Sequence, residues 1–75
     1  MPSYNLPKEV EQLVNDAIST VDFDPHDNNA YMNLYRHTES IWPFMGHRAR
    51  DNRVKKAMQY LKSLDLEATR KRRGI

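Results

Sequence analysis

Apolar residues recur at helical spacing in three separate segments of this chain, and this pattern limits the possible fold more than any other feature. Within each segment they follow one another at steps of three or four, which places them on one face of a helix. No segment alternates apolar and polar residues as a half-buried strand does. The pattern therefore predicts an all-α protein of three helices, at about residues 7–20, 29–42 and 51–68. The three apolar stripes are Val10, Leu13, Val14, Ala17, Ile18 and Val21; Tyr31, Leu34, Tyr35, Thr38, Ile41 and Trp42; and Val54, Ala57, Met58, Leu61 and Leu64.

The chain is short enough that its 75 residues form one domain at most. Such a domain buries a limited core, and because it contains no Cys it has neither disulfides nor thiolate metal sites. We therefore expect residues 1–69 to form a single helical domain whose stability comes from helix packing, from self-association or from a partner. Asp51 is expected to cap the third helix and to pair with Lys55 one turn later. Residues 70–75 offer no apolar face, and we expect them to form a basic tail that frays.

Charge is distributed very unevenly along the sequence. Residues 1–45 hold two Lys/Arg and seven Asp/Glu, whereas residues 46–75 hold ten Lys/Arg and three Asp/Glu. The formal net charge is therefore −5 in the first part and +7 in the second, although the whole chain carries only +2. Clustered Arg and Lys side chains suit contacts to the phosphates of DNA or RNA. The candidate phosphate-binding residues are Arg48, Arg50, Arg53, Lys55, Lys56, Lys62, Arg70, Lys71, Arg72 and Arg73.

Two uncharged polar residues, Asn52 and Gln59, lie within the basic third segment and have side chains able to read base edges. The connection between the second and third helices, about residues 43–51, is much longer than the turn of a helix-turn-helix motif. We therefore expect electrostatic binding with little sequence selectivity. The alternative is a basic face that is simply solvated, or one that is neutralised by acidic residues of the first helix. These acidic residues are Glu9, Glu11 and Asp16.

An apolar cluster stands between the second and third helices at residues 41–45. Five consecutive apolar residues cannot all face one core, so one or two of them should remain at the surface. One interpretation is a corner that closes the core. The other is a patch that docks on a protein partner, for which Trp and Met are well suited. The candidate partner-binding residues are Trp42, Phe44 and Met45, around Pro43.

No motif for catalysis or for cofactor binding is recognised in the sequence. A calcium loop starting at Asp22 needs Gly at its sixth position and Glu at its twelfth, and this chain has Asp27 and Asn33 there. The three His residues are 11 and 10 positions apart, which is not the spacing of a zinc site. The sequence therefore predicts a protein that is not an enzyme and that uses no metal and no cofactor.

Two functions remain open at this point. The first is a non-enzymatic regulatory or accessory protein that binds DNA or RNA through its basic C-terminal half. The second is a protein-binding adaptor or inhibitor that docks on a larger assembly through residues 42–45. Pairing of the acidic first helix with the basic third helix between two chains would give a homodimer. The absence of Cys, of a secretory leader and of a long apolar run, with a mean hydropathy of −0.89, favours a cytoplasmic protein without membrane contact.

Overall fold

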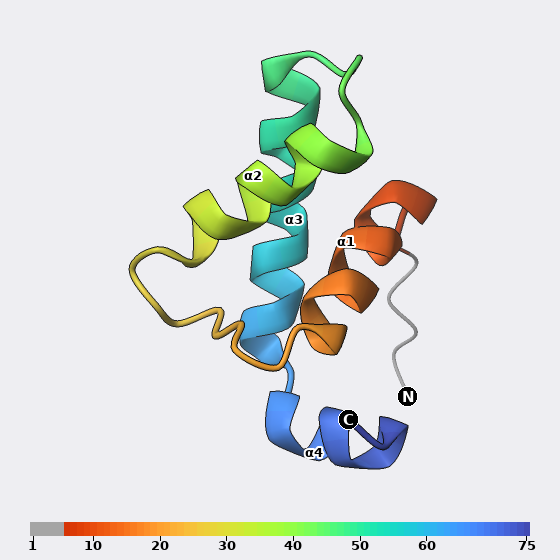
Figure 1. Ribbon diagram of the computed structural model, residues 1–75, viewed down its shortest axis with the longest axis vertical. Helices are drawn as coiled ribbons and strands as arrows, with labels where there is room; N and C mark the ends of the chain where they lie inside the picture. Colours follow the sequence, from red (N-terminus) through yellow and green to blue (C-terminus); the bar gives the residue numbers. More distant parts are fainter. Residues whose placement is uncertain (1–5) are drawn as a thin grey trace.

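The computed structural model describes residues 6–75 as four helices and their connections (Figure 1). The helices are α1 (Lys8–Ser19), α2 (Ala30–Ile41), α3 (His47–Ser63) and α4 (Leu66–Arg73). The described residues contain no strand, so the expectation of an all-α protein is confirmed. Among these helices, none combines the length and the apolar character that a membrane span requires.

Helix α3 lies at the centre of the fold, with α1 and α2 packed against it (Figure 1). The apolar stripes meet between these helices, and most of their residues are buried as the spacing predicts. Val21 is an exception, because it lies in the turn after α1 and is 68% exposed. Thr38 is buried, and its hydroxyl donates a hydrogen bond to the Tyr35 carbonyl at 2.5 Å, so this polar group is satisfied. The buried apolar residues are Val10, Leu13, Val14, Ala17, Ile18, Phe23, Ala30, Leu34, Val54, Ala57, Met58 and Leu61.

The predicted third helix is two helices in the structure, which gives four helices instead of three. Leu64 follows α3 in an extended conformation, with φ −87° and ψ 148°, and α4 begins at Leu66. Asp65 stabilises this break, because its carboxylate accepts a hydrogen bond from the backbone N–H of Ala68 at 3.1 Å. An Asp at the N-cap position satisfies a backbone donor that has no partner within the helix. The break therefore has a local cause that the apolar spacing does not show.

The expected frayed tail is not confirmed, because residues 70–73 belong to α4. The Arg70 guanidinium anchors this helix by donating hydrogen bonds to four backbone carbonyls. They lie at and just beyond the C-terminal end of α1, where the helix dipole is negative and carbonyls lack helical partners. The helix ends at Gly74, whose φ of 76° is a left-handed conformation that glycine adopts without strain. The acceptors of Arg70 are the carbonyl oxygens of Ala17, Ile18, Thr20 and Phe23, at 2.7–3.3 Å.

Helix α3 begins at His47, four residues before the predicted start at Asp51. Its N-cap residue is Gly46, which provides no side-chain hydrogen bond. Asp51 lies inside α3, where its carboxylate accepts a hydrogen bond from the Tyr31 hydroxyl of α2 and pairs with the Lys55 ammonium group at 3.2 Å. The expected cap is therefore wrong, because the helix extends a full turn further, whereas the expected pair with Lys55 is confirmed.

Candidate nucleic-acid interface on helix α3

The outer side of α3 carries a row of exposed polar and basic side chains. Five of these residues follow one another at steps of three or four, and the sixth, Lys56, lies directly beside this row. They therefore share one side of the helix. The opposite, apolar face packs against α1 and α2. A helix of 17 residues is about 25 Å long. The row, called the α3 basic face below, consists of Arg48, Asn52, Lys55, Lys56, Gln59 and Lys62.

Three of the four cations on the α3 basic face have no partner among residues 6–75. Arg48, Lys56 and Lys62 are exposed, and their side chains take part in no hydrogen bond or ion pair of the described chain. Lys55 pairs with Asp51 one turn earlier on the same helix. Exposed pairs of this kind are weak in water and are screened by salt. The face therefore presents three unpaired positive charges and a fourth that is partly compensated.

Arg50 and Arg53 are used inside the fold instead of on this face. The Arg53 guanidinium donates hydrogen bonds to the Glu9 carboxylate of α1 and, at 2.9 Å, to the Ala49 carbonyl. The Arg50 guanidinium lies 5.2 Å from the centre of the Tyr35 ring of α2, which is cation–π geometry. The Arg50 Nε atom is buried without a hydrogen-bond partner in the described chain, so this side chain faces the helix interface. These two predicted phosphate-binding residues hold α3 to its neighbours.

The four cations of α4 lie beyond the C-terminal end of α3 (Figure 1). Arg70 donates hydrogen bonds to backbone carbonyls at the C-terminal end of α1, as described above. The Arg73 guanidinium donates to the amide oxygen of Asn15 at 3.1 Å, and that of Arg72 donates to the Thr69 hydroxyl at 3.3 Å. Lys71 is exposed and makes no contact of this kind within residues 6–75. The ten predicted residues therefore divide between the α3 basic face, the helix interfaces and α4.

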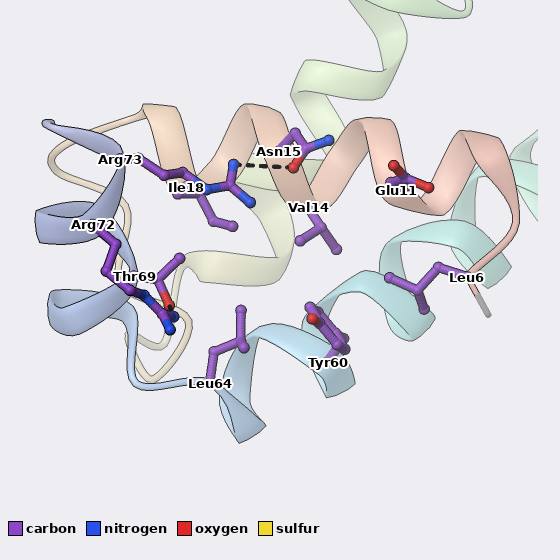
Figure 2. Close-up of a pocket in the computed structure, with 10 residues that line it drawn as sticks. All are labelled: Leu6, Glu11, Val14, Asn15, Ile18, Tyr60, Leu64, Thr69, Arg72 and Arg73. Carbon is purple, nitrogen blue, oxygen red and sulfur yellow. Dashed lines mark hydrogen bonds between the residues drawn. The ribbon is translucent and has the colours of Figure 1, made fainter. Parts of the chain in front are cut away.

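A groove between α1, α3 and α4 has a volume of about 520 Å³ (Figure 2). Figure 2 shows Arg72 and Arg73 at the α4 end of this groove and Leu6 at the far end. The dashed line in Figure 2 marks the hydrogen bond from Arg73 to Asn15, which joins α4 to α1. The groove therefore includes the place where α4 contacts α1.

Asp51 is the one acidic residue within α3, and its partners favour its charged form. The Tyr31 hydroxyl, and then the Lys55 ammonium group, hold the pKa of Asp51 below its ordinary value of 3.8. The same hydrogen bond raises the pKa of Tyr31 to about 12, because it favours the protonated hydroxyl. The negative charge of Asp51 thus persists beside Lys55, and Lys55 contributes less to phosphate binding than the three unpaired cations do.

The residues of the apolar corner between α2 and α3 have different environments. Trp42 is half-buried and packs against the core, and Met45 is half-buried as well. Phe44 is 101% exposed, and Pro43 is exposed beside it. The interpretation of a corner that closes the core therefore applies to Trp42, whereas the side chain of Phe44 is available to a partner.

The acidic residues of α1 neutralise the basic third helix at one position in the described chain, through the pair of Glu9 and Arg53. Asp16 instead lies 2.7 Å from the His37 ring of α2, and Glu11 is exposed. The two partners are separated by 44 residues in the first pair and by 21 in the second. Sequence reasoning missed these pairings because no local spacing links residues so far apart.

No group of three or more His, Cys, Asp or Glu side chains in the described part of the chain is placed to hold a metal ion. Comparisons with protein-family models, with curated proteins and with solved structures find no match to this chain. A functional assignment must therefore be argued from the α3 basic face and its surroundings.

Proposed function

We propose that this protein is a non-enzymatic regulatory or accessory protein that binds DNA or RNA through the α3 basic face. The observation that carries the proposal is the row of cations without partners in the described chain, namely Arg48, Lys56 and Lys62. Lys and Arg side chains that neutralise phosphates release bound counterions, which drives association. Asn52 and Gln59 lie on the same face, where their amide groups are suited to contacts with base edges.

The dimensions of the α3 basic face suit a duplex groove. An α-helix fits the major groove of B-DNA, which is about 12 Å wide. Arg48 and Lys62 are separated by about 21 Å along the helix axis, so side chains at both ends are able to reach phosphates outside the groove. The first turn of α3 holds no acidic residue, and its positive dipole end adds to the attraction for phosphate near Arg48.

The proposal predicts a clear dependence of binding on salt. Three phosphate contacts give a slope of roughly −3 in a plot of log affinity against log salt, and a contact from Lys55 extends it to about −4. Four to six contacts, the number expected from the sequence alone, would give roughly −4 to −5. The slope expected from the structure is smaller than the slope expected from the sequence, because Arg50, Arg53 and Arg70 make contacts within the fold and are not available to phosphates. Fluorescence anisotropy with a labelled duplex over a series of salt concentrations measures the slope.

Two double variants that remove equal charge separate the α3 basic face from general electrostatic attraction. Lys56→Gln with Lys62→Gln is expected to reduce the slope by about 2, one unit for each lost phosphate contact. Lys8→Gln with Arg36→Gln removes two exposed charges from α1 and α2 and is expected to leave the slope unchanged. Equal losses in the two double variants, or wild-type binding that does not respond to salt, would contradict the proposal.

The alternative function, a protein-binding adaptor or inhibitor, is supported by the exposed ring of Phe44. It predicts that Phe44→Ala abolishes capture of a protein partner, whereas Lys56→Gln with Lys62→Gln leaves that capture intact. A pull-down from a native lysate, with and without nuclease, separates the two functions. Nuclease releases only those partners that are held through nucleic acid.

A further inference from the structure

Phe44 is the one aromatic side chain among residues 6–75 that the rest of the described chain leaves fully uncovered. It occupies the third position of a tight turn, which is closed by a hydrogen bond from the Met45 N–H to the Trp42 carbonyl at 3.1 Å. Pro43 occupies the second position, where its fixed φ favours a turn. Because Trp42 packs against the core, one side of the turn is anchored. The turn therefore presents the Phe44 ring to solvent at a defined place.

The charged residue nearest to Phe44 in the sequence is a cation, Arg48. No Asp or Glu occurs in the sequence between Glu39 and Asp51, and Arg48 is exposed without a partner in the described chain. The Cα atoms of Phe44 and Arg48 are four residues apart and so at most about 15 Å from each other. The positive end of the α3 dipole lies between them. An uncovered aromatic ring near an unpaired cation and a helix N-terminus complements a polymer of bases and phosphates.

The strength of stacking decides which kind of base this ring is able to hold. Stacking of one base on an aromatic side chain increases affinity by roughly 5- to 150-fold. Opening a paired and stacked base step costs free energy of the same order. A single ring therefore gains little by entering an intact duplex. A base that is already unpaired carries no such cost.

We infer that Phe44 stacks on an unpaired base, at a bulge or a single-stranded end, beside the duplex held by the α3 basic face. The inference rests on the proposed function and narrows its substrate class to junctions between paired and unpaired nucleic acid. In this arrangement the cations of α3 supply most of the affinity, and Phe44 supplies the preference for the unpaired base.

Binding to two labelled probes tests the inference. One probe is a short duplex, and the other is the same duplex with a single unpaired base. The wild-type protein is expected to bind the second probe roughly 5- to 150-fold more tightly. Phe44→Ala and Phe44→Leu are expected to bind both probes as the wild type binds the intact duplex, because Leu keeps apolar volume but lacks a planar face. Phe44→Trp is expected to retain the preference.

Met32→Ala is the matched control, since it removes another exposed apolar side chain, from α2, and is expected to keep the preference. Equal wild-type binding to both probes overturns the inference and leaves the proposed function standing, whereas no binding to either probe at low salt overturns both. Full preference in Phe44→Leu excludes ring stacking and also overturns the inference. Sedimentation supplies a last test: a dimer lost in Phe44→Ala, with the probe preference unchanged, would assign Phe44 to a second copy of this chain.

Discussion

Replacement of Arg70 by Ala tests how α4 is attached to the rest of the fold. The wild-type guanidinium donates to four carbonyl oxygens at 2.7–3.3 Å. A hydrogen bond that involves a charged group contributes about 1.5–3 kcal/mol to stability. The four contributions do not add, because one partly exposed guanidinium makes all four bonds and water replaces part of what is lost. We expect Arg70→Ala to lower the free energy of unfolding by roughly 2–3 kcal/mol.

A loss of this size is large for so small a protein. Domains have about 0.05–0.15 kcal/mol of stability per residue, so a chain of 75 residues has roughly 4–11 kcal/mol in total. The expected fall in Tm is roughly 8–24 °C, at about 4–8 °C for each kcal/mol. Urea unfolding followed by circular dichroism measures the free energy, and the signal of the folded state reports whether the helix content falls as α4 detaches.

Two variants serve as controls for Arg70→Ala. Lys71→Ala removes the neighbouring exposed cation and is expected to change stability by less than about 0.5 kcal/mol. Arg70→Lys keeps the charge but has one compact donor group, so it is expected to recover only part of the loss. If Arg70→Ala proves as stable as Lys71→Ala, the guanidinium does not anchor α4, and the physical account of this helix is refuted.

Three further predictions concern the core, an ion pair and the dependence of stability on pH. Leu61 is fully buried, so Leu61→Ala is expected to lower the free energy of unfolding by about 2–5 kcal/mol, measured in urea. A double-mutant cycle of Glu9→Gln and Arg53→Gln is expected to give a coupling energy of only about 0–1 kcal/mol, because the side chains are 44% and 31% exposed and water screens them. The hydrogen bond from Tyr31 to Asp51 stabilises the fold fully above pH 3.8 and below pH 10.0, which are the ordinary pKa values of the two groups. This contribution is lost as the pH falls through the lowered pKa of Asp51 or rises through the Tyr31 pKa of about 12, so the stability difference between wild type and Tyr31→Phe should shrink at both extremes.

Helices α1 and α2 could be predicted from the sequence because the interactions that define them are local and periodic. Their observed ends lie within one residue of the predicted ranges 7–20 and 29–42. In each helix the apolar residues at steps of three and four also form the buried face. Where the spacing of apolar residues determines both the helix and its buried face, the sequence is sufficient to predict them.

The C-terminal part could not be predicted in the same way, because its structure depends on residues far away in the chain. Leu64 continues the apolar stripe from Leu61, so periodicity extends the helix across the observed break. Arg70 reaches carbonyls that lie 47 to 53 residues earlier in the sequence. In the sequence it is one of four consecutive basic residues, and nothing local distinguishes this anchor from a phosphate-binding side chain.

The candidate site shows the same limit. Helical spacing predicts which cations share the outer side of α3, but not which of them remain without partners. Arg53 is bound by Glu9 of α1, and Arg50 lies over the Tyr35 ring of α2. Arg48 is uncovered because no described residue of another helix reaches it. Availability is therefore a property of the tertiary structure and not of the basic sequence.

Two acidic residues of the connection between α1 and α2 form no ion pair with the α3 basic face among residues 6–75. Asp24 and Asp27 accept hydrogen bonds from the backbone N–H groups of His26 and Asn29, at 2.9 and 3.1 Å, and so shape the connection between α1 and α2. In the sequence, these two residues belong to the part with a formal net charge of −5, whereas the α3 basic face belongs to the part with +7. We expect a polyanion to be attracted by the unpaired cations of the α3 basic face and repelled by exposed carboxylates. Salt at 0.1 M screens such forces beyond about 10 Å, and for this reason the slope against salt tests the mechanism more directly than a single affinity does.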